Sequence, residues 1–172
     1  MDRGREEEGE EGEEMIEIVV VSDRVVSGEA KDESGIVAKE NLEKFGFKVD
    51  AMKYIGNSYR DIVRVIRESE SRVILFIGGT GPSPRDITVD VIESLAWRKL
   101  PGFGELFRMK SFESIGYNAI ISRSELFILP DGKVTVVLPG SKNAVELGIS
   151  ILKEFLSHLL EEVERFEGPH RK

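Results

Sequence analysis

The chain has 172 residues, of which 40% are hydrophobic, so it is long enough for one domain with its own core. Its formal net charge is −8, and without a broad basic excess we expect no binding to nucleic acid, although a small anionic ligand remains compatible with an acidic chain. It contains no cysteine, which excludes disulfides, catalytic thiolates and cysteine metal sites.

The first 14 residues are nearly all Glu, Gly and Arg. Such a run cannot bury apolar area, so we predict a disordered acidic tail over residues 1–14. The run also lacks the basic and apolar regions of a signal peptide. No apolar stretch approaches the roughly 20 residues that span a bilayer. We therefore expect a cytoplasmic protein without a membrane partner.

Strands and helices alternate after this tail. Residues 15–22 form an apolar run that ends in a polar turn, which is typical of a strand buried on both faces. Apolar spacing predicts helices over 32–45 and 59–68, a second strand over 47–55 between them, and a third strand over 73–77. This order predicts parallel strands joined by right-handed crossovers in a three-layer α/β/α sandwich.

The next segment breaks the purely parallel pattern. Helices are predicted over 87–95 and 103–114. The apolar runs 125–129 and 133–138 then flank the turn Pro130-Asp-Gly132, which is typical of a hairpin. An antiparallel strand is therefore expected in the otherwise mostly parallel sheet.

A long amphipathic helix follows Pro139-Gly-Ser141 and completes a single domain predicted over residues 15–166, with a C-terminal tail at 167–172. The two histidines, His158 and His170, have no partner at metal-ligand spacing, so a histidine metal site is not expected. The helix's apolar face consists of Val145, Leu147, Ile149, Leu152, Phe155, Leu156, Leu159 and Leu160.

Three polar loops follow predicted strands, at 22–24, 78–86 and 139–141. In open α/β sheets, ligands bind beyond the carboxyl ends of the strands. Because the three loops leave different strands at this same edge, they are expected to converge. Their convergence is the main reason to expect a binding site here.

The loop after the third strand carries the strongest signal. Its glycines allow the backbone to approach a ligand and to direct N–H groups at it, and Thr80 adds a hydroxyl. Arg85 could pair with phosphate, while Asp86 could hold a divalent cation or cap the next helix. No Gly-Lys-Ser/Thr follows, so this is not a Walker A loop. The glycines are Gly78, Gly79 and Gly81.

Two further segments allow either a ligand role or a structural one. Pro139, Gly140 and Ser141 stand where a strand gives way to a helix, whose free N–H groups attract anions, or Ser141 could simply cap that helix. Ser122 and Arg123 precede the hairpin and could hold a terminal phosphate or finish a turn.

Weaker signals lie elsewhere in the chain. Asp32 or Ser34 is a candidate helix cap, and Arg24 an ordinary surface charge. The segment 101–108, Pro-Gly-Phe-Gly-Glu-Leu-Phe-Arg, places apolar side chains beside two glycines. Those side chains could line a ligand cleft, pack between subunits or face the core.

Together these segments resemble the MogA/MoaB family of molybdenum-cofactor biosynthesis proteins, in the family's order and over about residues 15–160. The glycine loop with its Arg85-Asp86 and the 101–108 segment are the most specific. The matching segments are Ser22-Asp-Arg24, Asp32-Glu-Ser-Gly35, Gly78-Gly-Thr-Gly81 with Arg85-Asp86, Pro101–Arg108, Ser122-Arg123 and Leu138-Pro-Gly-Ser141.

The resemblance implies a fold, an activity and partners. Active members are molybdopterin adenylyltransferases, which transfer AMP from Mg-ATP to the terminal phosphate of molybdopterin and release pyrophosphate; the product then receives molybdate or tungstate. The family implies a homo-oligomer, a trimer or a hexamer, and contacts with other cofactor-biosynthesis proteins. From the sequence, interface anchors or core residues are Trp97, Phe103, Phe107 and Phe112.

The resemblance also implies roles for single residues. Asp86 matches an aspartate needed for catalysis, through Mg²⁺. The family usually has a second catalytic aspartate, in Pro-Asp-Asp or Pro-Asp-Glu, where this chain has Asn57 in Ile55-Gly-Asn-Ser58. Asparagine keeps an oxygen but loses the charge that would bind Mg²⁺. The residues matched to molybdopterin or nucleotide binding are Gly78, Gly79, Thr80, Gly81, Ser111, Ser122, Arg123, Pro139, Gly140 and Ser141.

Three functional hypotheses follow. The first is an adenylyltransferase that works with Asp86 and another acid. The second, favoured by Asn57, is a module that binds or hands over molybdopterin without adenylylating it. The third is a different ligand on the same fold, as in the CinA-type relatives, but Arg85-Asp86 and the segment 101–108 argue against it.

Overall fold

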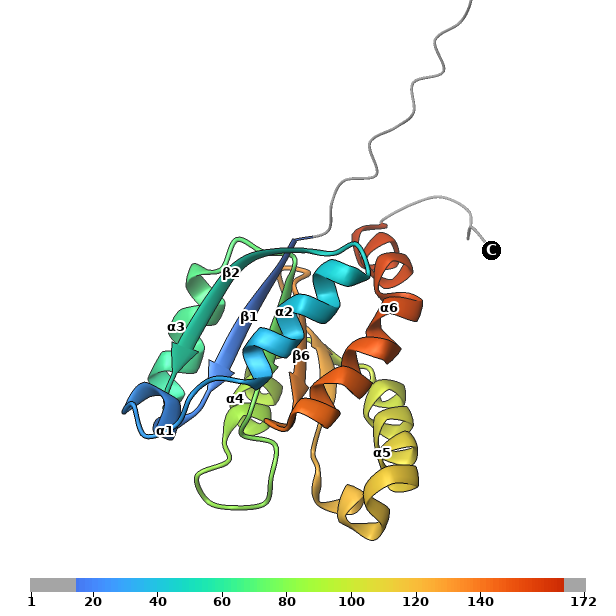
Figure 1. Ribbon diagram of the computed structural model, residues 1–172. Coiled ribbons are helices and arrows are strands. Elements are labelled where there is room, and N and C mark those ends of the chain that lie inside the picture. Colours follow the sequence, from blue (N-terminus) through green and yellow to red (C-terminus); the bar gives the residue numbers. More distant parts are fainter. Residues whose placement is uncertain (1–14, 166–172) are drawn as a thin grey trace, which may run out of the picture.

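A six-stranded sheet forms the centre of the computed structural model, which describes residues 15–165 (Figure 1). The predicted tails at 1–14 and 167–172, with His170, lie outside the described residues. The strands run in the order β2-β1-β3-β6-β5-β4. They are β1 (Met15–Val21), β2 (Lys48–Ile55), β3 (Val73–Ile77), β4 (Arg98–Lys99), β5 (Glu125–Ile128) and β6 (Val134–Leu138).

Four neighbouring strands are parallel and two are added at one edge. β2, β1, β3 and β6 pair in parallel, whereas β5 is antiparallel to β6 and β4 is antiparallel to β5. This confirms a mostly parallel sheet that carries an antiparallel hairpin. β4 was not predicted, because its two residues are too few to show any periodicity.

Helices cover both faces of the sheet and make the three layers (Figure 1). α2, α5 and α6 pack on one face, and α3 and α4 pack on the other. The helices are α1 (Asp23–Val26), α2 (Ser34–Lys44), α3 (Tyr59–Glu68), α4 (Thr88–Leu95), α5 (Pro101–Ile115) and α6 (Lys142–Glu164), with the 3-10 helix η1 (Gly116–Ile121). None of the helices within residues 15–165 is long and apolar enough to cross a membrane.

The two cores explain why the central strands are apolar at almost every position. Ile18 and Leu75 face the helices α2 and α6, while Val19 and Phe76 face α3 and α4. All four side chains are buried, and each contributes about 1.5–3 kcal/mol through burial. Such strands read as continuous apolar runs because both of their faces are covered.

The crossovers place a topological switch point at the carboxyl ends of two strands. α2 leads from β1 to β2 over one face, and α3 leads from β2 to β3 over the other. The chain therefore changes direction between β1 and β3, which are neighbours in the sheet. In open α/β sheets, such a switch point is where ligands bind.

Candidate active site

The loops that follow β1, β2, β3 and β6 lie together at one end of the sheet, the lower end in Figure 1. Backbone hydrogen bonds link them: Ser22 N donates to Ile55 O at 2.9 Å, and Gly78 N donates to Leu138 O at 2.8 Å. The predicted convergence of the three polar loops is therefore present. It brings segments from four strands to a single edge.

The glycine loop presents backbone donors that the protein itself does not use. Gly78 and Gly79 have φ angles of +111° and +75°, which residues other than glycine rarely adopt. Within residues 15–165, the N–H groups of Gly79, Thr80 and Gly81 donate to no protein acceptor. Successive free N–H groups in such a turn form a concavity that binds anions.

Arg123 holds this loop in place through hydrogen bonds to its backbone carbonyls. Its Nε and Nη2 donate to Gly81 O at 3.0 and 2.9 Å, and Nη2 also donates to Asp86 O at 2.8 Å. Its Nη1 pairs with Asp90 at 2.8 Å, and the hydrogen bond from Arg123 holds the pKa of Asp90 below its ordinary value. Arg123 thus ties both ends of the loop together, and direct phosphate binding by it stays a prediction.

Asp86 closes the loop and does not cap α4. Its Oδ2 accepts from Ser83 N at 3.2 Å, while Asp86 N donates to Ser83 O at 2.9 Å. The cap position of α4 is Ile87, without a side-chain cap, so the capping alternative for Asp86 is wrong. The half-buried carboxylate keeps an oxygen with no protein donor among the described residues.

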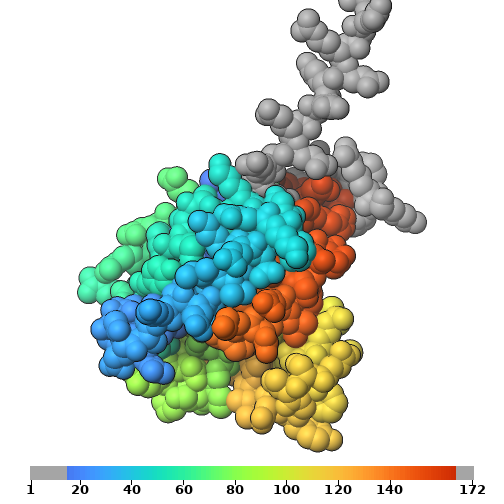
Figure 2. Space-filling model, in the orientation of Figure 1, coloured from blue at the N-terminus to red at the C-terminus, as the bar shows by residue number. Residues whose placement is uncertain are grey.

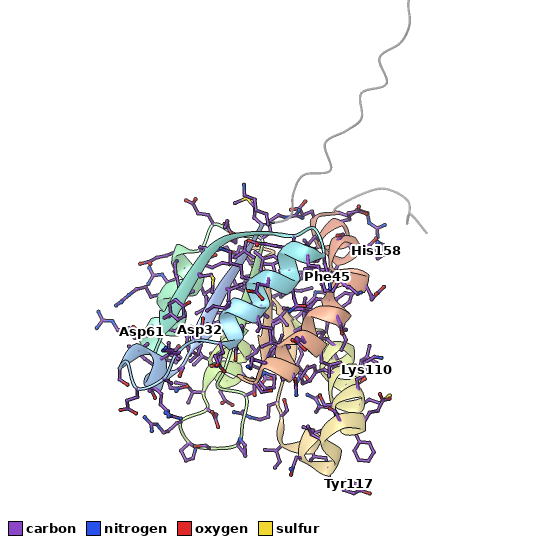
Figure 3. The ribbon with its side chains drawn as sticks, in the orientation of Figure 1. Asp32, Phe45, Asp61, Lys110, Tyr117 and His158 are labelled. Carbon is purple, nitrogen blue, oxygen red and sulfur yellow. The ribbon has the colours of Figure 1, made fainter. Side chains whose placement is uncertain are left out.

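A magnesium ion would fit here only as part of a nucleotide complex. Within residues 15–165 there is no group of three or more Asp, Glu or His side chains that could hold a metal. Mg²⁺ usually binds through one or two carboxylates together with substrate phosphates. Asp86 beside the free loop amides meets that requirement. His158 lies on α6, at the opposite end from these loops (Figure 3). No histidine metal site was expected from the sequence, and His158 is remote from the candidate site.

Asn57 lies against Asp23, the first residue of α1. Its backbone N donates to Asp23 Oδ1 at 2.9 Å and its Nδ2 to Asp23 Oδ2 at 3.0 Å. Arg85 Nη2 reaches the same Oδ2 at 3.0 Å. The hydrogen bonds from Asn57, followed by the charge of Arg85, hold the pKa of Asp23 below its ordinary value. Sequence reasoning missed Asp23 as a centre of contacts; a polar Ser-Asp-Arg directly after β1 was its only signal.

The second predicted loop, 139–141, is fixed from both sides. Ser141 Oγ accepts from Ala144 N at 3.2 Å and so caps α6. Ser34 Oγ donates to Gly140 O. Asp32 Oδ1 accepts from Gly35 N at 2.7 Å, so Asp32 is the residue that bonds into the first turn of α2. Ser141 has its structural role, and ligand binding by Pro139, Gly140 and Ser141 stays a prediction.

The segment 101–108 begins α5, and its phenylalanines belong to the core. Phe103 is 6% and Phe107 1% exposed. Gly104 permits close contact with β5, since a Cβ there would lie 2.0 Å from Glu125 Oε1. Arg108 donates to Ser124 O and Glu125 Oε1, both at 2.8 Å. The core interpretation of Phe103 and Phe107 is therefore confirmed, and they are not interface anchors.

The two predicted pterin-site serines lie on either side of η1. Ser111 is buried on α5. Ser122 follows η1, and its Oγ is 3.0 Å from Ser124 Oγ. Arg108 links their two segments through Ser124. Figure 2 shows η1, in orange, at the same end of the molecule as the glycine loop, in yellow-green.

A cleft of ≈ 840 Å³ lies at the opposite end of the sheet. It is lined by residues that include Trp97, Arg98 and Pro130. Several of its charged groups form ion pairs, Lys133 with Asp131 at 3.0 Å and Arg72 with Glu164 at 2.8 Å. The carboxyl-end loops are the better candidate site because their donors are unpaired.

Comparison with known proteins identifies the family to which this chain belongs. Residues 17–158 match the family described as "Probable molybdopterin binding domain". The chain belongs to the MogA/MoaB family. It is 36% identical over 149 residues to a molybdopterin adenylyltransferase of Pyrococcus furiosus, covering 83% of this chain and 87% of that protein. It is 36% identical over 138 residues to molybdenum cofactor biosynthesis protein B of Halalkalibacterium halodurans, with coverages of 77% and 81%.

Solved structures agree with this assignment. The crystal structure of the tungsten cofactor synthesising protein MoaB from Pyrococcus furiosus superposes with a TM-score of 0.84 at 31% identity, over 90% of this chain and 99% of that one. A CinA protein from Thermoplasma acidophilum superposes with a TM-score of 0.60 at 15% identity, over 86% and 98%. The latter likeness shows the fold alone.

Proposed function

We propose that this protein is a molybdopterin adenylyltransferase in molybdenum or tungsten cofactor biosynthesis. In this reaction an oxygen of the terminal phosphate of molybdopterin attacks the α-phosphorus of Mg-ATP. One P–O bond forms, the bond between the α-phosphorus and the α,β-bridging oxygen breaks, and pyrophosphate leaves. The names of the curated relatives, molybdopterin adenylyltransferase among them, support the assignment.

The free amides of the glycine loop carry this proposal. They would hold an anionic phosphate of either substrate at a fixed place beside Asp86. Asp86 would hold the magnesium of the nucleotide, and that ion supplies neutralisation of the charge on the phosphates. Such a transfer needs positioning and charge neutralisation more than a covalent nucleophile. The binding residues proposed from the resemblance, including Ser111, Ser122 and Gly140, complete the site.

The direct test measures pyrophosphate release from Mg-ATP with and without molybdopterin. We expect release that depends on molybdopterin, and a fall of about 100-fold or more in Asp86→Asn, because Asp86 would hold the ion that neutralises charge in the transition state, and losing one such electrostatic contribution costs that much. Asp131→Asn removes the same charge from the hairpin turn at the opposite end and should leave the rate unchanged. Full turnover by Asp86→Asn would contradict the role given to Asp86.

A second candidate function is supported by Asn57, which is uncharged where the family usually has an aspartate. The protein would then bind and hand over molybdopterin without adenylylating it. Calorimetric binding of molybdopterin, with no pyrophosphate release at any Mg-ATP concentration, would select this function. Neither binding nor release would argue against both.

We also propose a homo-oligomer, a trimer or a hexamer, assembled through α5 and η1. Figure 2 shows these elements as a projecting lower corner of the molecule, and Figure 3 shows Tyr117 pointing outward from it. Contiguous exposed apolar residues of this kind mark protein interfaces. They are Leu106, Met109, Phe112, Ile115, Tyr117, Ile120 and Ile121, with Met109, Tyr117 and Ile120 at 66%, 78% and 75% exposure.

Sedimentation velocity tests the assembly. The unmodified protein should sediment as an oligomer. The Ile120→Glu variant should sediment as a monomer, because association would bury an unpaired charge at the interface. Ile36→Glu places the same charge on an exposed isoleucine of α2 and should leave the sedimentation coefficient unchanged. A monomeric unmodified protein would contradict this part of the proposal.

A further inference from the structure

The outer face of α3 carries a stripe of arginines. Arg60, Arg64 and Arg67 are four and three residues apart, so they share one side of the helix. All three are exposed, whereas the opposite face of α3 packs against the sheet. This arginine stripe borders a hollow of ≈ 530 Å³ on the helix surface. The hollow is lined by Tyr59, Arg60, Val63, Arg64, Arg67 and Glu68.

The domain itself leaves the charge of the arginine stripe largely uncompensated. Arg64 lies 3.7 Å from Asp61 with its side chain 52% exposed, and such a surface pair contributes little. Within residues 15–165, Arg60 and Arg67 form no ion pair and no side-chain hydrogen bond. Arg60 also lies in the first turn of α3, where the helix dipole disfavours a cation. The stripe therefore has positive charge available for an anionic partner.

The chain carries a polyanionic segment of its own. Residues 1–14 contain eight acidic and two basic side chains, so six of the chain's eight net negative charges precede Met15. Most of the acids stand in the runs Glu6-Glu-Glu8, Glu10-Glu11 and Glu13-Glu14. Blocks of like charge of this kind often act as interaction tails. A basic surface is the partner that their chemistry requires.

The point where this segment joins the domain lies at the same end of the sheet as the end of α3. Ile16, the second residue of β1, pairs with Val73 of β3, and α3 ends at Glu68, five residues before Val73. Figure 1 shows the start of β1 and the end of α3 in the upper part of the molecule. Fourteen extended residues span up to about 46–50 Å, whereas a ten-residue helix such as α3 is about 15 Å long. Residues 1–14 are therefore long enough to reach every arginine of the stripe.

We propose that the acidic residues 1–14 dock on the arginine stripe of their own chain. Covalent attachment favours this partner over a free anion, because a short linker gives an effective concentration in the millimolar range. The docked segment neutralises the charge on the outer face of α3 and closes that face to other polyanions. This interaction surface is separate from the candidate active site and does not depend on the proposed adenylyltransferase function.

Fluorescence quenching in the full-length chain tests the docking. The chain has no cysteine and one tryptophan, Trp97. Gly9→Cys in a Trp97→Phe background therefore gives a single position for a bimane label, whose emission tryptophan quenches on contact. Tyr59→Trp places the quencher at the arginine stripe. Ile36→Trp is the matched control on α2, because Ile36 is 52% and Tyr59 58% exposed.

Three exposed ion pairs should favour the docked state by about tenfold. The label should therefore be strongly quenched in the Tyr59→Trp protein and not in the Ile36→Trp protein. Replacing the three stripe arginines with glutamine should restore the emission. About 1 M NaCl, which shortens the Debye length to about 3 Å, should do the same. Replacing Lys39, Lys44 and Lys153 with glutamine removes the same charge from α2 and α6 and should leave the quenching unchanged.

Several outcomes would overturn the docking. They are equal emission from the Tyr59→Trp and Ile36→Trp proteins, quenching that survives the loss of the three arginines, and quenching that the lysine substitutions abolish. Samples that carry the label and the introduced tryptophan on different chains should show no quenching. Quenching in those samples would mean that the segment docks on a second copy and would overturn the contact within one chain.

The docking and the proposed function fail separately. None of the fluorescence measurements contains Mg-ATP or molybdopterin, so a protein without pyrophosphate release can still show the full quenching pattern. Conversely, an active transferase whose label is equally bright in both tryptophan variants retains the proposed function and loses the docking.

Discussion

The two ends of the sheet differ in what their polar groups do. At the carboxyl end, the loop amides of Gly79, Thr80 and Gly81 have no protein acceptor within residues 15–165, while Arg123 supports the loop from beneath. At the amino end, a cleft of ≈ 840 Å³ is bordered by ion pairs in which the two charges neutralise each other. Donors that remain unpaired are thus a better guide to a ligand site in this molecule than the presence of a cleft.

The largest effect that would sharpen this contrast is expected at Arg123. Arg123→Ala removes the donors to Gly81 O and Asp86 O, which should lower kcat/KM about 100-fold and the free energy of unfolding by about 2–3 kcal/mol. Trp97→Ala in the amino-end cleft should leave kcat/KM unchanged. Steady-state pyrophosphate assays and urea denaturation measure both.

Arg123→Lys is the control for charge. Lysine keeps the positive charge but cannot reach both loop carbonyls with a planar fork. We therefore expect Arg123→Lys to resemble Arg123→Ala in kcat/KM. Full activity of the lysine variant would show that the charge suffices and that the loop needs no bidentate support.

An effect on stability should separate two glycines, one at each end of the sheet. Gly79 and Gly132 both have positive φ, +75° and +91°. A Cβ at Gly79 would lie 2.1 Å from Thr88 Oγ1, whereas at Gly132 the nearest atom is 3.6 Å away. Gly79→Ala should cost about 2–5 kcal/mol, from backbone strain and overpacking, and Gly132→Ala about 1–2 kcal/mol, from strain alone. Equal urea midpoints for the two variants would contradict this.

The smallest effect concerns pH. The hydrogen bond from Arg123 lowers the pKa of Asp90 from its ordinary 3.8, so the folded state favours the ionised carboxylate. Its contribution is present above pH 3.8 and is lost as the pH falls through the lower, folded-state pKa. Since Asp90 is 57% exposed, we expect only a few tenths of a kcal/mol. Unfolding titrations of Asp90→Asn between about pH 2 and pH 5 should show a correspondingly flatter profile.

The sequence indicated the sheet and the edge where the loops meet, because burial on both faces leaves continuous apolar runs and each run ends in polar residues. α3 and β3 have the predicted limits. β4 and η1 were missed, since a strand of two residues and a 3-10 helix of six residues are too short to show a clear periodicity. Phe103 and Phe107 also showed that apolar residues beside glycines cannot be divided between core and interface before the packing is known.

Single roles in the site were harder to predict than its position. Arg123 was expected to hold a phosphate or to finish a turn, and its contacts with two loop carbonyls were not expected, because those carbonyls are more than 35 residues away in the sequence. Asp23 was treated as part of a weak motif, because its partners come from two other loops. Contacts of that kind depend on the distance between strand ends, which local patterns do not encode.

The bond from Gly78 N to Leu138 O has a consequence for the thermodynamics of ligand capture. It joins the start of the glycine loop to the end of β6, two residues before Gly140, so neither loop has to be ordered when an anion arrives. Ordering one residue costs about 1–2 kcal/mol in conformational entropy, and this cost is met when the domain folds. The amide hydrogen of Gly78 should therefore exchange with solvent as slowly as those of the central strands, with or without ligand.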